Sequence, residues 1–236
     1  MPEIIILNEQ DLEQIITLEQ VINLVERGFS SYYRGGFTPF PVVREKINTY
    51  EGIFGIKSGY VTDGDLLGFK AGGYWKNNPS LGIPAHRSVI LLFDPQTGNA
   101  RSIMDGNFIT TIRTGAVGAI AAKYLARKNS QVATIIGCGT QGRMQLRALK
   151  GVLPIGDIRC YDISLKNAEV VAKEMSSQDC AVTGVASPED AVTGADVVVT
   201  TTRSDWIDPG IHISTMGADT NRRNAACLGP SGKRGG

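Results

Sequence analysis

The sequence lacks the features that would place it in several broad classes. Its 24 basic and 23 acidic residues leave a net charge of +1, so no charge excess favours nucleic acid or an anionic membrane. No apolar run reaches about 18 residues, and no basic segment precedes the apolar start of the chain. We therefore expect a soluble, cytoplasmic protein that binds its partners at local sites, with no nucleic acid and no membrane among them.

Cysteine and histidine are scarce. The four cysteines contain no Cys-x-x-Cys pair, and His86 and His212 have no metal-binding spacing with them. We expect buried free thiols, structural histidines and no metal site. Glycine, in contrast, is abundant, with 28 of 236 residues against an average usage of about 7%. Close approach of the backbone to another element or to a ligand is therefore expected.

The first part of the chain predicts an α+β arrangement. A short strand at 4–7 is followed by one amphipathic helix from about Leu12 to Phe29, whose apolar residues recur every three to four positions. Between residues 39 and 105, β-branched and aromatic runs separated by glycine, proline and asparagine indicate a mostly antiparallel sheet. An Asp-Pro-Gln-Thr-Gly turn at 94–98 predicts a hairpin within it.

The second part has a different rhythm. Residues 110–128 are predicted as a helix capped by Thr110 or Thr111, and its many small residues predict a close neighbour. From residue 129 onward, strands alternate with helices, which is typical of a parallel, doubly wound sheet. The sequence thus predicts two domains of an α/β protein, an α+β domain at 1–112 and a doubly wound domain at 113–236.

A glycine-rich motif marks the second domain as Rossmann-type. The segment from Gly137 to Gly142, GCGTQG, follows an apolar strand and begins a helix. Gly137 permits a tight turn, Gly139 lets the backbone approach a pyrophosphate, and Gly142 allows close packing of helix on strand. The next strand ends in Asp162, which can accept both ribose hydroxyls and would repel a 2′-phosphate, so NAD is expected over NADP. The alternative is an ordinary strand–turn–helix connection.

These motifs occur in a family context. The run RTGAVGAIAAKYLARKNSQVATIIGCGTQG, with GFKAGGYWKNNPSLGIP before it and HISTMGAD after it, resembles the ornithine cyclodeaminase/mu-crystallin family over about residues 1–220. The resemblance implies a homodimer whose first domain both dimerises and holds a small amino acid or imino acid, facing a nicotinamide on the second domain. The family includes ornithine cyclodeaminases, archaeal-type alanine dehydrogenases, ketimine and iminosuccinate reductases, and crystallin-type binding proteins.

Residue by residue, the resemblance assigns Arg44, Lys70 and Arg113 to contacts with the substrate carboxylate and the cofactor. A carboxylate needs a fixed cation, and a guanidinium binds it through two hydrogen bonds. Arg113 is expected in the first turn of its helix, where the dipole disfavours a cation unless an anion is bound. Without the resemblance, an exposed charge at a strand end describes Arg44 equally well.

The resemblance also assigns Asp219 as the acid/base residue and places Thr140 and Gln141 at the pyrophosphate. Removal of hydride from an α-carbon requires a neutral amine, and a carboxylate can accept the proton that the amine loses. Thr202 is expected to be the one threonine of the 200–202 run that touches the cofactor. By themselves, Asp219 would be an ordinary turn residue and the threonines would be strand formers.

Two departures from the family pattern bear on function. Ornithine cyclodeaminases carry an acid at about Gly55, whereas this chain has Lys57 in the same stretch, so a cationic substrate side chain loses its partner. A shifted loop would bring Glu51 close instead. Near the end, NRRNAACLGPSGKRGG has no strand or helix periodicity where the family continues. This predicts a truncated chain whose nucleotide sheet is incomplete at the C-terminus.

The sequence therefore predicts NAD-dependent hydride transfer at the α-carbon of a small neutral or acidic amino acid or its imine, with Lys70 and Asp219 as catalytic residues. Two alternatives remain open. One is cyclodeamination of ornithine, in which the hydride is borrowed and returned and ammonia leaves. The other is a mu-crystallin-like protein that binds NAD(P)H and a small ligand without turnover, which the unusual tail favours.

Overall fold

The structure, a computed structural model, describes residues 3–201 and 212–215. The chain forms two compact units, Met1–Ile112 and Arg113–Gly236. Within the described residues, no helix is long and apolar enough to cross a membrane.

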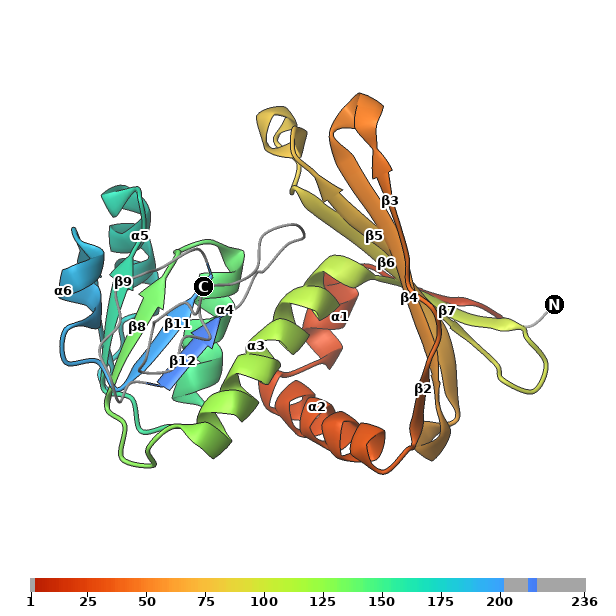
Figure 1. Cartoon of the computed structure of the whole chain (residues 1–236), viewed down its shortest axis with the longest axis horizontal. Coiled ribbons are helices and arrows are strands. Elements are labelled where there is room, and N and C mark those ends of the chain that lie inside the picture. The colour runs from red at the N-terminus through yellow and green to blue at the C-terminus, as the bar shows by residue number, and fades with distance from the viewer. Residues whose placement is uncertain (1–2, 202–211, 216–236) are drawn as a thin grey trace, which may run out of the picture. The chain divides into compact units, whose positions relative to one another are not determined.

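The first unit is built on a seven-stranded sheet. Its strands are β1 (Ile5–Leu7), β2 (Phe37–Pro39), β3 (Val43–Ile47), β4 (Gly52–Val61), β5 (Leu66–Trp75), β6 (His86–Phe93) and β7 (Ala100–Asp105). The order is β1-β7-β6-β5-β4-β2, with β3 also paired to β4 (Figure 1). All pairs are antiparallel except β1 with β7, so the predicted antiparallel sheet is confirmed. Short 3-10 turns occur at Asn48–Tyr50, Thr62–Gly64 and Asn78–Leu81.

Two helices replace the single N-terminal helix that the sequence predicts. They are α1 (Glu9–Ile15) and α2 (Leu18–Tyr33), which lie on one side of the sheet (Figure 1). The break is caused by a capping box. The hydroxyl of Thr17 accepts a hydrogen bond from the N–H of Gln20, whose side chain accepts one from the N–H of Thr17. This exchange starts a new helix in the middle of the apolar pattern.

The helix α3 (Gly106–Leu125) begins earlier than predicted, and the prediction of Thr110 or Thr111 as its cap is wrong. The cap is Asp105, whose Oδ1 accepts hydrogen bonds from the N–H groups of Asn107 at 2.7 Å and Phe108 at 3.3 Å. Arg113 therefore lies beyond the first turn. The predicted conflict between its charge and the helix dipole does not arise.

The second unit is a five-stranded parallel sheet of β8 (Val132–Ile136), β9 (Asp157–Tyr161), β10 (Ala181–Val185), β11 (Val197–Thr200) and β12 (His212–Thr215). Its order, β10-β9-β8-β11-β12, is that of a Rossmann-type sheet, in which the first strand of the unit is central. The connecting helices are α4 (Thr140–Lys150), α5 (Leu165–Met175) and α6 (Pro188–Val192). The predicted doubly wound sheet is confirmed.

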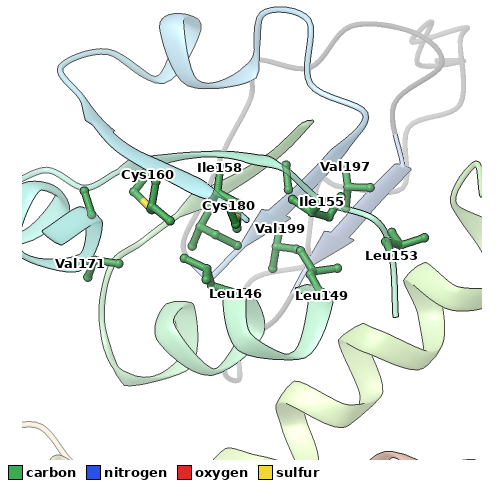
Figure 2. Packing of buried hydrophobic residues seen from close by; sticks show 14 of the residues in the cluster. Leu146, Leu149, Leu153, Ile155, Ile158, Cys160, Val171, Cys180, Val197 and Val199 are labelled. Atoms are coloured by element: carbon green, nitrogen blue, oxygen red, sulfur yellow. The ribbon is translucent and has the colours of Figure 1, made fainter. Parts of the chain in front are cut away.

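Both faces of this sheet are buried, which is why its strands are almost wholly apolar. Figure 2 shows Leu146 and Leu149 of α4 directed toward the strands that carry Ile158, Val197 and Val199. All five side chains are fully buried. The opposite face is covered by a smaller cluster of Ile136, Val192, Ala195 and Val198. The packed sheet gives the glycine turn a rigid support.

The close neighbour that the small residues of α3 predict is α4. A Cβ on Gly115 would lie 2.5 Å from Met144 Cγ, and one on Gly118 would lie 1.9 Å from Gln145 Oε1. Gln145 is fully buried and donates through Nε2 to the carbonyl of Thr114 at 2.9 Å. Larger residues at 115 and 118 would displace the side chains of Met144 and Gln145.

Candidate functional site

The glycine turn connects β8 to α4 at the carboxyl end of the central strand. Gly137 has a φ of +100°, and a Cβ there would lie 2.3 Å from Thr201 Oγ1. A Cβ on Gly142 would lie 2.0 Å from the carbonyl oxygen of Gly137. Both positions therefore require glycine, the first for its backbone conformation and the second for the approach of helix to strand.

Gly139 requires a different explanation. Its φ of −76° suits any residue, and a Cβ there would meet nothing within 4 Å. Gly139 is the N-cap of α4. Among the described residues, no side chain caps the first turn of the helix, which contains Thr140 and Gln141. Backbone N–H groups and the dipole at a helix N-terminus attract anions. Open space and donors thus occur at one place, which fits a pyrophosphate.

Asp162 follows β9 and ties the glycine turn to the next segment. Its Oδ2 accepts a hydrogen bond from the N–H of Cys138 at 2.8 Å, and its Oδ1 accepts one from the N–H of Ser164 at 3.0 Å. Burial acts to raise the pKa of Asp162, but the hydrogen bonds from Ser164, Cys138 and Asn167 and the charge of Arg143 outweigh it and lower the pKa. The carboxylate is thus ionised at neutral pH and keeps lone pairs for ribose hydroxyls.

Sequence reasoning missed two residues beside this turn. The hydroxyl of Thr201 lies 3.1 Å from the carbonyl oxygen of Ile136 and 3.0 Å from that of Gly137, and so holds the turn against the end of β11. Ile163, directly after Asp162, is 98% exposed and offers an apolar surface beside the Asp162 carboxylate. The threonine run was the signal for Thr201. The exposure of Ile163 has no signal in the sequence.

A buried side-chain oxygen without a hydrogen-bond partner among the described residues lies at the start of α4, beside the turn. Gln141 Oε1 is buried and has no hydrogen-bond partner in the described structure. A buried acceptor of this kind is costly unless a ligand or water satisfies it. The glycine turn, the start of α4 and the Asp162 carboxylate together fit the pyrophosphate and ribose of a dinucleotide.

In the first unit, Lys70 occupies the middle of β5. It is half-buried, and its Nζ donates to Thr110 Oγ1 of α3 at 3.1 Å. The strand register places Lys57 of β4 opposite Lys70, and Gly55 of β4 opposite Arg44 of β3. Paired residues share a face, and faces alternate along a strand. Arg44, Lys57 and Lys70 therefore lie on one face, the same face that the start of α3 covers.

The remaining residues that the sequence assigns to the site are Arg113, Asp219, Thr202 and Glu51. Arg113 is exposed on α3, and partial desolvation lowers the pKa of its guanidinium. Arg113 stays charged at neutral pH, because the ordinary pKa of a guanidinium is far above neutrality. Asp219 and Thr202 lie outside the described residues. Glu51, the alternative to the missing acid, forms an exposed ion pair with Lys76 at 2.9 Å.

The cysteines that the structure describes are buried free thiols, as expected. They are Cys138, Cys160 and Cys180. A hydrogen bond with Cys138 and burial both raise the pKa of the Cys160 thiol, so it stays protonated. Among the described ranges, no group of three or more histidine, cysteine or acidic residues could hold a metal.

The class of protein follows from these features. A Rossmann-type unit with a dinucleotide-type glycine turn follows an α+β unit whose sheet displays cations on one face. The ornithine cyclodeaminase/mu-crystallin family model matches residues 3–225, and the chain belongs to this family. The predicted resemblance is thus confirmed.

Individual relatives agree. The chain is 36% identical over 230 residues to the alanine dehydrogenase of Archaeoglobus fulgidus, covering 92% of this chain and 68% of that protein. The structure of Thermococcus litoralis Δ1-pyrroline-2-carboxylate reductase with NADH and L-proline matches at a TM-score of 0.86 and 35% identity, covering 91% and 69%. The structure of an archaeal alanine dehydrogenase dimer with bound NAD matches at a TM-score of 0.82 and 34% sequence identity. The match covers 89% of this chain and 66% of that protein. The chain thus spans about two thirds of these proteins.

Proposed function

We propose that this chain carries out NAD-dependent hydride transfer at the α-carbon of a small amino acid or its imine. The observation that carries the proposal is the glycine turn, where the open space at Gly139 meets the uncapped start of α4, with the ionised Asp162 alongside. NAD or NADH is bound in the two similar structures described above, which supports the same cofactor here. The Asp162 carboxylate favours NAD over NADP, because it would repel a 2′-phosphate.

The substrate end of the proposal rests on the cations. When bound, the nicotinamide supplies or accepts the hydride. Arg44 and Arg113 are proposed to orient the α-carboxylate, since guanidinium groups bind carboxylates through paired hydrogen bonds. Lys70, positioned by Thr110, would polarise or protonate the imine nitrogen. Asp219 remains the proposed acid/base on the grounds of sequence.

The reaction is tested by following NADH at 340 nm. In the reductive direction, a 2-oxo acid, ammonium, NADH and a proton give the amino acid, NAD and water. Pyruvate, glyoxylate, oxaloacetate and cyclic imines form the substrate panel. We expect NADH consumption with at least one of them, its loss in Lys70→Met, and its retention in Lys46→Met, a variant of an exposed lysine on β3. Tight NADH binding with no consumption across the panel would reject catalysis in favour of the binding-protein alternative.

Cyclodeamination is the rival reaction. It predicts ammonia release from ornithine with no lasting change at 340 nm. The presence of Lys57 on the face that carries Lys70 counts against a substrate with a cationic side chain.

We further propose that the chain forms a homodimer through the other face of the first sheet. That face carries Ile56, Phe69 and Leu91, which are only half-buried. An apolar sheet face of this kind is unfavourable in water, and a similar protein has been solved as a dimer. Sedimentation should give a dimer for the wild type and a monomer for Leu91→Lys. Leu66→Lys, on the Lys70 face, should stay dimeric, and a wild-type monomer at micromolar concentration would reject the proposal.

A further inference from the structure

The sheet face that carries Lys70 has a one-sided charge distribution. Register and alternation place Arg44, Lys57 and Lys70 together on this face. In strands β1 to β7, the acidic residues are Glu45, which lies on the opposite face, and Asp105, whose carboxylate caps the start of α3. Around Arg44, Lys57 and Lys70, strands β3 to β5 therefore supply cations and no carboxylate on this face. Such a surface attracts anions.

Lys57 is the residue that the proposed reaction leaves unexplained. It lies directly opposite Lys70 in the β4–β5 pair. Side chains in such pairs have Cβ atoms about 5 Å apart, and like charges there are destabilising. Lys57 is exposed and forms no hydrogen bond or ion pair within the described part of the chain. A bound anion would relieve the repulsion between the two ammonium groups.

Glycines keep the surface between these cations free of side chains. Gly55 is paired with Arg44 on one side and with Gly72 on the other, and this row adjoins the row of Lys57 and Lys70. Two residues along a strand span about 7 Å. Arg44 and Lys57 thus flank a bare stretch of sheet that is short enough for one small ligand to contact both.

We infer that the substrate carries a second carboxylate and that Lys57 binds it. The inference rests on the proposed function and assigns its substrate class, a four-carbon dicarboxylic amino acid or its imine. Arg44 binds the α-carboxylate, and Lys57 binds the carboxylate of the side chain. A distal amine at the same place would face an ammonium group, so a diamino acid is disfavoured.

Binding is tested first, without turnover. Malate and lactate share a 2-hydroxy acid end and differ in the second carboxylate. Calorimetric titration of the whole chain with NADH present should give malate about tenfold or more tighter binding than lactate, the range of a charged hydrogen bond. Lys57→Met should remove this preference by weakening malate alone. Lys46→Met removes a positive charge from the same face, two rows from Lys57, and should keep the preference for malate. This control distinguishes a specific contact with Lys57 from a general effect of positive charge.

Turnover separates the inference from the proposed function. With ammonium and NADH, oxaloacetate should have a higher kcat/KM than pyruvate, and Lys57→Met should remove this preference by raising the KM for oxaloacetate. Faster turnover of pyruvate, with equal binding of malate and lactate, would overturn the inference and leave the proposed function intact. A malate preference that depends on Lys57, without turnover of any 2-oxo acid, would support the inference and reject the reaction. Thermal melting checks that both lysine variants are folded.

Discussion

Adding one methyl group at each of two glycines in the turn is expected to have opposite consequences. In Gly142→Ala, the new Cβ would lie 2.0 Å from the carbonyl oxygen of Gly137 and 3.2 Å from Ile135 Cγ2. The first neighbour is backbone and cannot rotate away, so α4 must move from β8. Overpacking of this kind lowers the free energy of unfolding by about 1–3 kcal/mol.

In Gly139→Ala, the new methyl group enters open space at an ordinary φ. The free energy of unfolding should therefore change by less than about 1 kcal/mol. The same methyl group occupies the place where the backbone is proposed to approach the pyrophosphate. Loss of one or more charged hydrogen bonds, each of about 1.5–3 kcal/mol, would weaken NADH binding roughly tenfold to a hundredfold.

Two measurements separate the effects. Urea unfolding followed by circular dichroism gives the free energy of unfolding, and fluorescence titration gives the affinity for NADH. Gly156→Ala is the matched control, because its Cβ would also meet nothing within 4 Å but lies away from the turn. It should resemble the wild type in both measurements. If Gly139→Ala binds NADH as tightly as Gly156→Ala, the turn does not hold the pyrophosphate. If Gly142→Ala is as stable as the wild type, the packing argument is wrong.

Three further predictions concern the second unit. Asp162→Asn should narrow the preference for NADH over NADPH in binding titrations. Because the pKa of Asp162 is lowered in the folded state, its stabilising contribution is present above its usual pKa and is lost as pH falls through the lowered value. In urea unfolding, the free energy of unfolding should therefore be higher for the wild type than for the variant at pH 6, and the difference should disappear at pH values below the lowered pKa. Leu149→Ala, in the core under the sheet, should cost about 2–5 kcal/mol in the same assay, and a loss below 1 kcal/mol would contradict the burial. Thr201→Val should cost about 1 kcal/mol and weaken NADH binding, and an unchanged affinity would mean that the turn keeps its shape without this hydroxyl.

The second unit was the more predictable of the two, because its elements carry complete local signals. The alternation of strands and helices predicted after residue 129 is present, with β10 and α6 among its elements. The errors fell where two local signals compete. The apolar period ran through Thr17, but its capping box with Gln20 interrupts the helix. The threonines near 110 looked like caps, yet Asp105 caps α3 first.

The sequence by itself was enough to determine the glycine turn and the acid after the next strand, because the conformation of glycine and the alternation of strand and helix are properties of short segments. Apart from the hairpin at 94–98, the pairing of the strands could not be determined from the sequence. The register that brings Arg44, Lys57 and Lys70 onto one face joins strands across separate turns. The hydrogen bonds of Thr201 to the turn likewise join segments 64 and 65 residues apart. Such contacts depend on how the whole sheet packs, so the tertiary structure was needed to place them.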